Sequence, residues 1–292
     1  MTERRRLVRV PATSANLGPG YDVLAAALAI HLELEVTETG TFGVDAGDAP
    51  VPEDRANLCV RAFERLHPAD GLRFEIHSQI PVASGLGSSA AAIVAGLMAA
   101  EHLYELALER EQLLAHAVEL EGHPDNVAAA IYGGFVICSE RDGVPSATRL
   151  DPPEGVESVV VVPSEEVPTA EARRAIPVEI PVADAIANVA AASLLVLGVQ
   201  RSDLTLIERG LADRIHQPRR ADLYPRSLEL VAQARELGAI GATISGAGPS
   251  VLVWTFWQNT GQVVEALRER AAGWAKVHRA PFSPLGADVP EL

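Results

Sequence analysis

The chain has 292 residues, a formal net charge of −15 and 48% hydrophobic residues. That hydrophobic fraction is too high for a mainly disordered chain, and the acidic balance argues against a dedicated nucleic-acid-binding protein. The length allows one large domain or two of ordinary size.

Cysteine usage and the apolar runs predict a cytoplasmic protein. Cys59 and Cys138 stand far apart and give neither a disulfide framework nor metal-ligand spacing. The apolar run at residues 7–10 is too short for a signal peptide. The longest apolar stretch, residues 185–200, contains polar residues and falls short of a membrane span. We therefore expect no membrane and no nucleic acid among the partners.

The first half of the chain predicts alternating strands and helices. Leu32, Leu34 and Val36 alternate with Glu33 and Glu35, which is typical of a half-buried strand. Other strands are expected at residues 7–10, 72–76 and 135–139. Helices are expected at 58–66, from the segment after residue 87 to about 104, at 111–120 and from about 125 onward.

Residues 141–155 are rich in Asp, Gly and Pro, which indicates a domain boundary. We expect an N-terminal domain at 1–150 and a C-terminal domain at 151–292. In the second half, strands are expected at 159–162, 242–245 and 251–254. Helices are expected at 170–175, 183–197, 204–215, 227–237 and 262–272. The mixture predicts two α+β domains.

The segment Gly85-Leu-Gly-Ser-Ser89 precedes a long uncharged helix. Glycines allow the backbone to approach a ligand, and a helix start presents free N–H groups, so the segment suits phosphates. The alternative is a plain glycine turn capped by serine. The sole lysine is Lys276, so the P-loop pattern and the protein-kinase strand lysine are both absent.

Three further segments combine polar and small residues. Pro11–Asp22 reads as a polar loop leaving a strand, Glu121–Asn126 lies at a helix junction, and Gly241–Ser250 reads as a turn between strands. Taken alone, each is also compatible with an ordinary turn or helix cap.

Taken together and in this order, Pro11–Asp22, Pro81–Ala91 and Gly241–Ser250 resemble the three signature motifs of the GHMP small-molecule kinases. The first motif and His123-Pro-Asp-Asn-Val127 are most similar to the branch that phosphorylates L-homoserine with ATP. The resemblance implies a ribosomal-protein-S5-like N-terminal domain and a ferredoxin-like C-terminal domain, with the active site between them. It also implies the product O-phospho-L-homoserine, a place in threonine biosynthesis and a homodimer.

The resemblance assigns the substrate's charges to particular residues. Arg173 and Arg220 would hold the carboxylate, in preference to the adjacent Arg174 and Arg219. Asp22 would pair with the ammonium group.

Further roles are implied for two asparagines, the nucleotide and the metal. Asn16 and Asn126 would bind the substrate and orient its hydroxyl, and with Arg173 they form the catalytic set. Mg²⁺ would be held by Ser88 and Glu121, with Glu119 as an alternative to the latter. ATP would be held by Asn57, which is equally compatible with a helix N-cap, and by the phosphate loop: Pro81, Val82, Ala83, Ser84, Gly85, Leu86, Gly87, Ser88, Ser89, Ala90 and Ala91.

Because the N-terminal region has no lysine, we hypothesise that catalysis relies on alignment without a dedicated carboxylate base. His123 and His216 are alternative proton acceptors, although structural roles are favoured for both. Three other functions are open to the sequence: a GHMP kinase for another alcohol, a non-catalytic binding protein, and a serine hydrolase. The hydrolase is the weakest, because no Gly-x-Ser-x-Gly surrounds Ser88 or Ser89.

Overall fold

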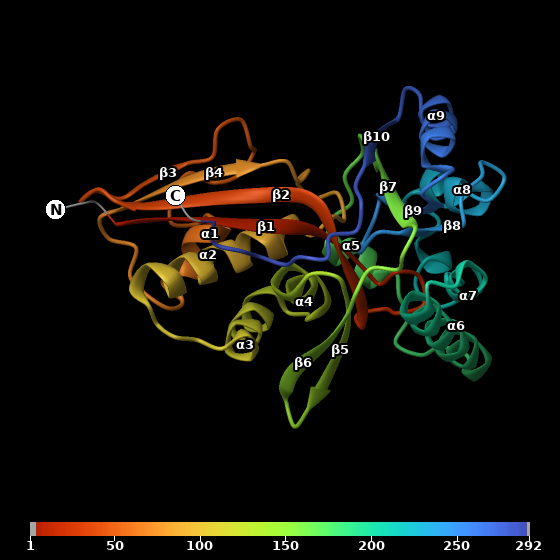
Figure 1. Cartoon of the computed structure of the whole chain (residues 1–292), viewed down its shortest axis with the longest axis horizontal. Helices are drawn as coiled ribbons and strands as arrows, with labels where there is room; N and C mark the ends of the chain where they lie inside the picture. Colours follow the sequence, from red (N-terminus) through yellow and green to blue (C-terminus); the bar gives the residue numbers. More distant parts are fainter. Residues whose placement is uncertain (1–3, 291–292) are drawn as a thin grey trace.

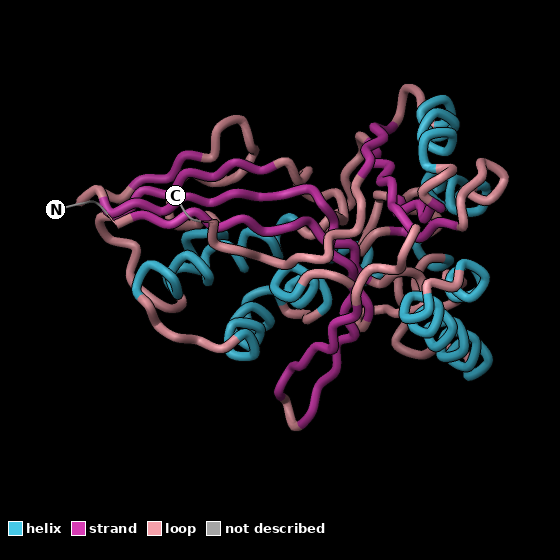
Figure 2. Tube along the Cα trace, viewed as in Figure 1, coloured by secondary structure: helices cyan, strands magenta, loops and turns pink. Residues whose placement is uncertain are grey.

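The structure is a computed structural model that describes residues 4–290, and it consists of two sheets with helices packed against them (Figures 1 and 2). The first half contains β1 (Arg5–Ala15), β2 (Leu24–Glu38), β3 (Gly43–Asp45), α1 (Leu58–Glu64), β4 (Leu72–Ser78), α2 (Ser88–Tyr104), α3 (Arg110–Glu121), α4 (Asp125–Tyr132), β5 (Phe135–Arg141) and β6 (Val144–Leu150). The second half contains β7 (Val156–Pro163), α5 (Thr169–Arg174), α6 (Val182–Arg201), α7 (Leu204–Gly210), the 3₁₀ turn η1 (Pro218–Arg220), α8 (Pro225–Gln233), β8 (Gly241–Ile244), β9 (Val251–Phe256), α9 (Thr260–Arg270) and β10 (Ala275–Arg279).

The first sheet has the order β3-β4-β2-β5-β6, with β1 antiparallel to β2. The long strand β2 organises it, because β1, β4 and β5 all pair with it. In Figure 1, helices α1–α4 lie together below this sheet, and β5 and β6 project as a hairpin. Together these elements form the ribosomal-protein-S5-like half of the expected fold.

The second sheet is antiparallel throughout, in the order β10-β7-β9-β8. Helices α8 and α9 pack against it, and α6 and α7 form a separate antiparallel pair (Figure 1). Gly198 and Gly210 allow α6 and α7 to approach closely. A Cβ at either position would overlap the backbone of the other helix. The predicted α+β class is confirmed.

Strands β1 and β2 are longer than predicted. The alternation at Leu32–Val36 is confirmed, but β2 begins at Leu24 with a run of buried small residues. Such a run is buried on both faces and shows no alternation. Residues 11–15 were expected to form a loop, but strand β1 continues through them. The polar side chains of Thr13 and Ser14 fit a buried strand because their hydroxyls are hydrogen-bonded.

Several other expectations differ from the structure. Strands β3, β6 and β10 were not predicted, and α7 ends at Gly210 rather than continuing to 215. The helix stops because the Asp213 carboxylate accepts the backbone N–H groups of Ile215, His216 and Gln217, which favours a turn. The division at residue 150 stays a prediction; the first sheet ends at Leu150 and the second begins at Val156.

The C-terminal segment 280–288 returns to the first sheet as a strap along β1 and β2. Asp288 exchanges backbone hydrogen bonds with Arg9 and also pairs with its guanidinium at 2.9 Å. Phe282 contacts Phe135 of β5 and Trp254 of β9, with ring centroids 4.8 and 5.0 Å apart. The strap therefore ties the two sheets together.

Helix α6 differs from the expectation for residues 185–200. Among the helices that the structure describes, it alone is long and apolar enough to cross a membrane by length and composition. Its Val182, Ile186 and Val189 side chains are exposed. Length and composition do not distinguish a membrane span from a helix that packs on a partner.

Candidate active site

A cavity of about 870 Å³ lies where the two halves of the chain meet. Its walls come from the loop after β1, the glycine-rich loop before α2, the junction of α3 and α4, helix α5, the turn η1 and the loop after β8. The residues of interest that line it are Asn16, Tyr21, Asp22, Asn57, Gly85, Gly87, Ser88, Ser89, Glu121, His123, Asp125, Asn126, Arg173, Arg220 and Gly246.

Helix α2 begins at the cavity with its N-terminus uncapped. Gly87 precedes the helix at φ 69°, and no side chain caps it. Gly85 is also left-handed, at φ 84°. A Cβ on Gly87 would overlap the Thr13 hydroxyl, so both the conformation and the space require glycine. The free N–H groups of the first turn make this end of the cavity suitable for phosphate.

The loop before α2 is held by hydrogen bonds from both halves of the chain. Leu86 accepts a backbone hydrogen bond from Thr13 of β1 at 3.1 Å. Ser245, which follows β8, donates to the Gly85 carbonyl at 2.6 Å and lies 2.8 Å from Ser14 Oγ. The loop conformation therefore depends on residues from three separate motifs.

Most of the predicted nucleotide residues line the cavity. Three do not, because their side chains are buried in the core: Leu86, Ala90 and Ala91. The remaining loop residues do: Pro81, Val82, Ala83, Ser84, Gly85, Gly87, Ser88 and Ser89.

Asn57 caps helix α1 and also lines the cavity. Its Oδ1 accepts from Cys59 N at 2.9 Å, and its Nδ2 donates to Pro52 O at 2.7 Å. The N-cap alternative is confirmed, and the adenine contact stays a prediction.

Glu121 and Ser89 place a carboxylate and a hydroxyl oxygen side by side at the cavity. Ser89 donates to Glu121 Oε1 at 2.7 Å, and burial is the main cause that raises the pKa of Glu121. A buried carboxylate with this cost of ionisation is one that a cation would stabilise, so the donors fit Mg²⁺. Ser88 lines the cavity without a hydrogen bond to Glu121, and Glu119 is exposed and pairs with Arg65.

In the same cavity, Arg173 and Asp22 form a two-pronged ion pair with distances of 2.7 and 3.0 Å. Arg173 Nη1 also lies 3.2 Å from the hydroxyl of Tyr21, a residue for which no role was predicted. The neighbouring Arg174 is exposed and donates to Ala170 of its own helix. The preference for Arg173 at the cavity is therefore consistent with where the two side chains lie.

Arg220 reaches the cavity from the other side and is only 1% exposed. Its Nε donates to Ala172 O at 2.9 Å, and its Nη1 donates to Gly246 O at 3.1 Å. Arg219 instead pairs with Asp184 at 3.3 Å and does not line the cavity.

The two predicted asparagines have different surroundings. Asn16 donates to Gly246 O at 2.7 Å and accepts from Asp22 N at 3.0 Å, so both ends of its amide bind the backbone. Asn126 accepts the Thr13 hydroxyl at 2.7 Å through Oδ1. Asn126 therefore turns its Nδ2 away from Thr13 and has a donor to offer a ligand.

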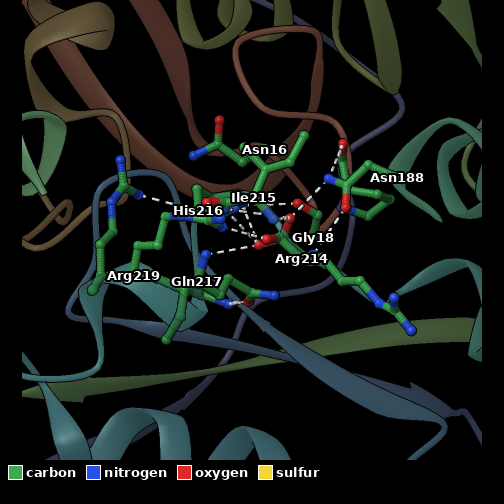
Figure 3. A network of polar contacts seen from close by, with 12 residues as sticks. Asn16, Gly18, Asn188, Arg214, Ile215, His216, Gln217 and Arg219 are labelled. Carbon is green, nitrogen blue, oxygen red and sulfur yellow. Dashed lines mark hydrogen bonds and ion pairs between the residues drawn. The ribbon is translucent and has the colours of Figure 1, made fainter. Parts of the chain in front are cut away.

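The two candidate histidines also differ. His123 lines the cavity 3.3 Å from Asp125, whose carboxylate raises the pKa of this imidazole. His216 is fully buried outside the cavity lining, and burial lowers its pKa to about 4. Figure 3 shows His216 inside a dense polar network with Gly18, Asn188 and Gln217.

The sequence and the fold both match known families of proteins. Residues 56–134 match the GHMP kinases N terminal domain, and residues 193–276 match the GHMP kinases C terminal family. These matches define the class as an ATP-dependent small-molecule kinase.

Similar proteins narrow that class. A homoserine kinase of Moorella thermoacetica is 40% identical over 257 residues, covering 85% of this chain and 86% of that protein. A homoserine kinase of Clavibacter michiganensis is 43% identical over 266 residues, covering 86% and 83%. The crystal structure of homoserine kinase from Cytophaga hutchinsonii is similar at 30% identity and a TM-score of 0.88, covering 99% of this chain and 98% of that one. The chain belongs to the homoserine kinases of the GHMP family.

Proposed function

We propose that the chain transfers the γ-phosphoryl group of ATP to the side-chain hydroxyl of L-homoserine, giving O-phospho-L-homoserine. The observation that carries this proposal is a single cavity lined by both an uncapped helix N-terminus and the Arg173–Asp22 ion pair. The first suits phosphate, and the second offers both charges that an amino-acid zwitterion requires.

The amino acid would replace the ion pair rather than add to it. Its carboxylate would take the Arg173 guanidinium, together with Arg220, and its ammonium would take the Asp22 carboxylate. A ligand with only one of these charges would leave the other partner unpaired in a partly enclosed site, which is costly. This argues against alcohols that lack an ammonium group.

The phosphates would lie along the first turn of α2, with Glu121 and Ser88 holding Mg²⁺. When bound, Mg²⁺ would neutralise negative charge on the phosphate oxygens. The amide of Asn126 has its Nδ2 free to donate to the reacting hydroxyl oxygen. In this arrangement Asn126 orients the hydroxyl and does not take its proton.

His216 is fully buried and does not line the cavity, so it cannot meet the reacting hydroxyl. His123 lines the cavity and pairs with Asp125, so it is the alternative base. The mechanism we propose is catalysis by alignment, in which the hydroxyl proton leaves late to a phosphate oxygen. Loss of turnover at unchanged substrate affinity in His123→Ala would contradict this mechanism.

The test measures ADP release from ATP and Mg²⁺ with L-homoserine, 4-hydroxybutanoate, 3-aminopropan-1-ol and mevalonate. We expect turnover with L-homoserine only. Arg173→Ala should raise KM for L-homoserine by about tenfold or more, because a charge-assisted pair is lost, whereas the exposed Arg174→Ala should be neutral. Preference for mevalonate, or ATP binding without transfer, would overturn the proposal.

We also propose that the enzyme acts in the cytoplasm as a homodimer. The two buried free thiols support the cytoplasmic location. The exposed apolar side chains of α6, namely Val182, Ile186 and Val189, support the dimer. Light scattering of the purified chain tests this, and Ile186→Asp should produce monomers if α6 forms the interface. A monomeric wild-type chain would overturn it.

A further inference from the structure

The strongest unexplained feature outside the cavity lining is the buried network at residues 213–220 (Figure 3). Its centre is the Asp213 carboxylate, whose side chain is 0% exposed. That carboxylate accepts the backbone N–H groups of Ile215 and Gln217 at 2.8 and 2.7 Å. Asn188 of α6 donates to it at 2.8 Å. The turn is therefore built around one carboxylate and fixed to another helix.

The same turn is tied to two other parts of the site. Asn188 also donates to Pro19 of the loop after β1 at 3.1 Å. The Gln217 side chain accepts the Ile244 N–H of β8 at 2.6 Å. The turn thus keeps a fixed position relative to both loops that line the substrate end of the cavity.

His216 stands between this turn and Arg220. Its Nε2 lies 2.7 Å from Gly18 O, and its Nδ1 lies 3.2 Å from Arg220 Nη1. A carbonyl oxygen can only accept and a guanidinium can only donate, so Nε2 carries the hydrogen and Nδ1 presents its lone pair. The ring is therefore neutral, and Tyr21 covers it with ring centroids 5.4 Å apart.

The Arg220 guanidinium is thereby held on two of its three nitrogens. Nε donates to Ala172 O, and Nη1 donates to Gly246 O and His216 Nδ1. Within residues 4–290, Nη2 has no hydrogen-bond partner, and the buried Tyr224 hydroxyl, which lies beside the guanidinium, is also without one. We infer that His216 is a positioning residue, which fixes Arg220 so that Nη2 is presented to the carboxylate of the substrate. This inference rests on the proposed function and deepens it.

Two substitutions separate the two hydrogen bonds of the ring. His216→Asn can place its Oδ1 near the Nδ1 position and so keep an acceptor for Arg220, while it loses the bond to Gly18. His216→Gln can reach Gly18 with its Nε2 and removes the acceptor for Arg220. We expect His216→Gln to raise KM and Kd for L-homoserine about tenfold, with kcat and KM for ATP little changed. His216→Asn should raise them clearly less.

A purely structural role of His216 would affect ligands with and without a carboxylate alike, whereas a role in positioning Arg220 would affect only the ligand with a carboxylate. The dissociation constants of L-homoserine and 3-aminopropan-1-ol, measured by calorimetry, should respond differently, because the second ligand has no carboxylate. His216→Gln should weaken the first and leave the second unchanged. Arg220→Gln should weaken the first at least as much, and the double variant should be no worse than Arg220→Gln. Arg219→Gln, at the neighbouring position, is the matched control and should change neither.

Each outcome is decisive. Equal weakening of both ligands, additive effects in the double variant, or a loss of kcat at unchanged KM would overturn the positioning role of His216 while the proposed function stands. If the wild-type chain neither binds nor phosphorylates L-homoserine, the proposed function fails and this inference fails with it. Thermal melting of each variant identifies those that are unfolded.

Discussion

At the scale of single residues, two arginines of the site are prepared for substrate in different ways. Arg220 is buried and held by backbone carbonyls and His216, whereas Arg173 is partly exposed and paired with Asp22. Under the proposed function, Arg173 would change partners when a zwitterion enters, whereas Arg220 would need no rearrangement. We expect Arg220 to set the position of the carboxylate and Arg173 with Asp22 to select for the zwitterion.

The hydrogen bond from Thr13 fixes the orientation of the Asn126 amide. The Thr13 hydroxyl donates to Asn126 Oδ1 at 2.7 Å, which leaves Nδ2 to face a ligand. Thr13→Val removes that donor at nearly constant volume, so the amide is free to turn and kcat should fall about tenfold. Thr13→Ser keeps the hydroxyl and should retain most of the wild-type rate in steady-state assays. Equal losses in both variants would show that the methyl group matters instead.

The pH dependence of stability follows from His216. Burial lowers its pKa to about 4, against an ordinary value of 6.5, while Asp213 acts in the opposite direction. Between these values the unfolded chain binds a proton that the folded chain does not. The free energy of unfolding should therefore fall as pH decreases from about 6.5 to about 4, by at most about 1.4 kcal/mol per pH unit.

Denaturant unfolding across this pH range measures the effect, with His216→Phe as the comparison. That variant cannot take up the proton, so its unfolding free energy should fall less steeply. Parallel curves for the two proteins would show that His216 does not titrate in this range.

The residues of the site were predictable where a motif carries them. Asp22, Asn126 and Arg173 were assigned through the resemblance, and the structure brings them to one cavity. Asp213 and the roles of Thr13 and Tyr21 were not predicted. Their partners lie far away in the sequence, as with the 2.7 Å bond between Thr13 and Asn126, and no local pattern marks such contacts.

At the scale of elements, the start of α2 is the feature on which the proposed phosphate binding depends. A methyl group on Gly87 would overlap the Thr13 hydroxyl at a backbone φ of 69°. Gly87→Ala should therefore distort the loop and weaken ATP binding about tenfold or more, as calorimetry would measure.

Gly143, in the turn between β5 and β6, is the matched control. It has φ +78°, but an added Cβ would meet nothing within 4 Å. Gly143→Ala should cost about 1 kcal/mol of stability from the left-handed conformation alone and leave ATP affinity unchanged. Equal ATP affinity in both variants would contradict a role for this loop in phosphate binding.

Elements with a periodic pattern were predictable, and elements defined by long-range burial were not. The half-buried part of β2 shows alternation, whereas Leu24–Leu28 is buried on both faces and shows none. Residues 144–150 are polar and exposed enough to read as a linker, yet they pair with β5 from Phe135 to Arg141. The pairing partner, rather than local composition, makes β6 a strand.

At the scale of the whole molecule, the candidate active-site cavity requires both halves of the chain in fixed relative positions. The loop after β8 touches the phosphate loop through Ser245, and Asn16 reaches Gly246. The C-terminal strap adds a second connection, because Ala29 and Ser283 make backbone bonds between the strap and β2. A loosened strap should therefore affect the residues that line the cavity on both halves of the chain.

Phe282 tests that connection. It is 7% exposed and lies between Phe135 of the first sheet and Trp254 of the second. Phe282→Ala should lower the free energy of unfolding by about 3–5 kcal/mol, since it removes a buried ring from a packed cluster. Because the same ring joins the two sheets, KM for both ATP and L-homoserine should rise. Leu285→Ala, on the same strap at 67% exposure, should change neither stability nor KM. If Phe282→Ala lowers stability while both KM values stay at the wild-type level, the strap stabilises the fold without setting the geometry of the cavity.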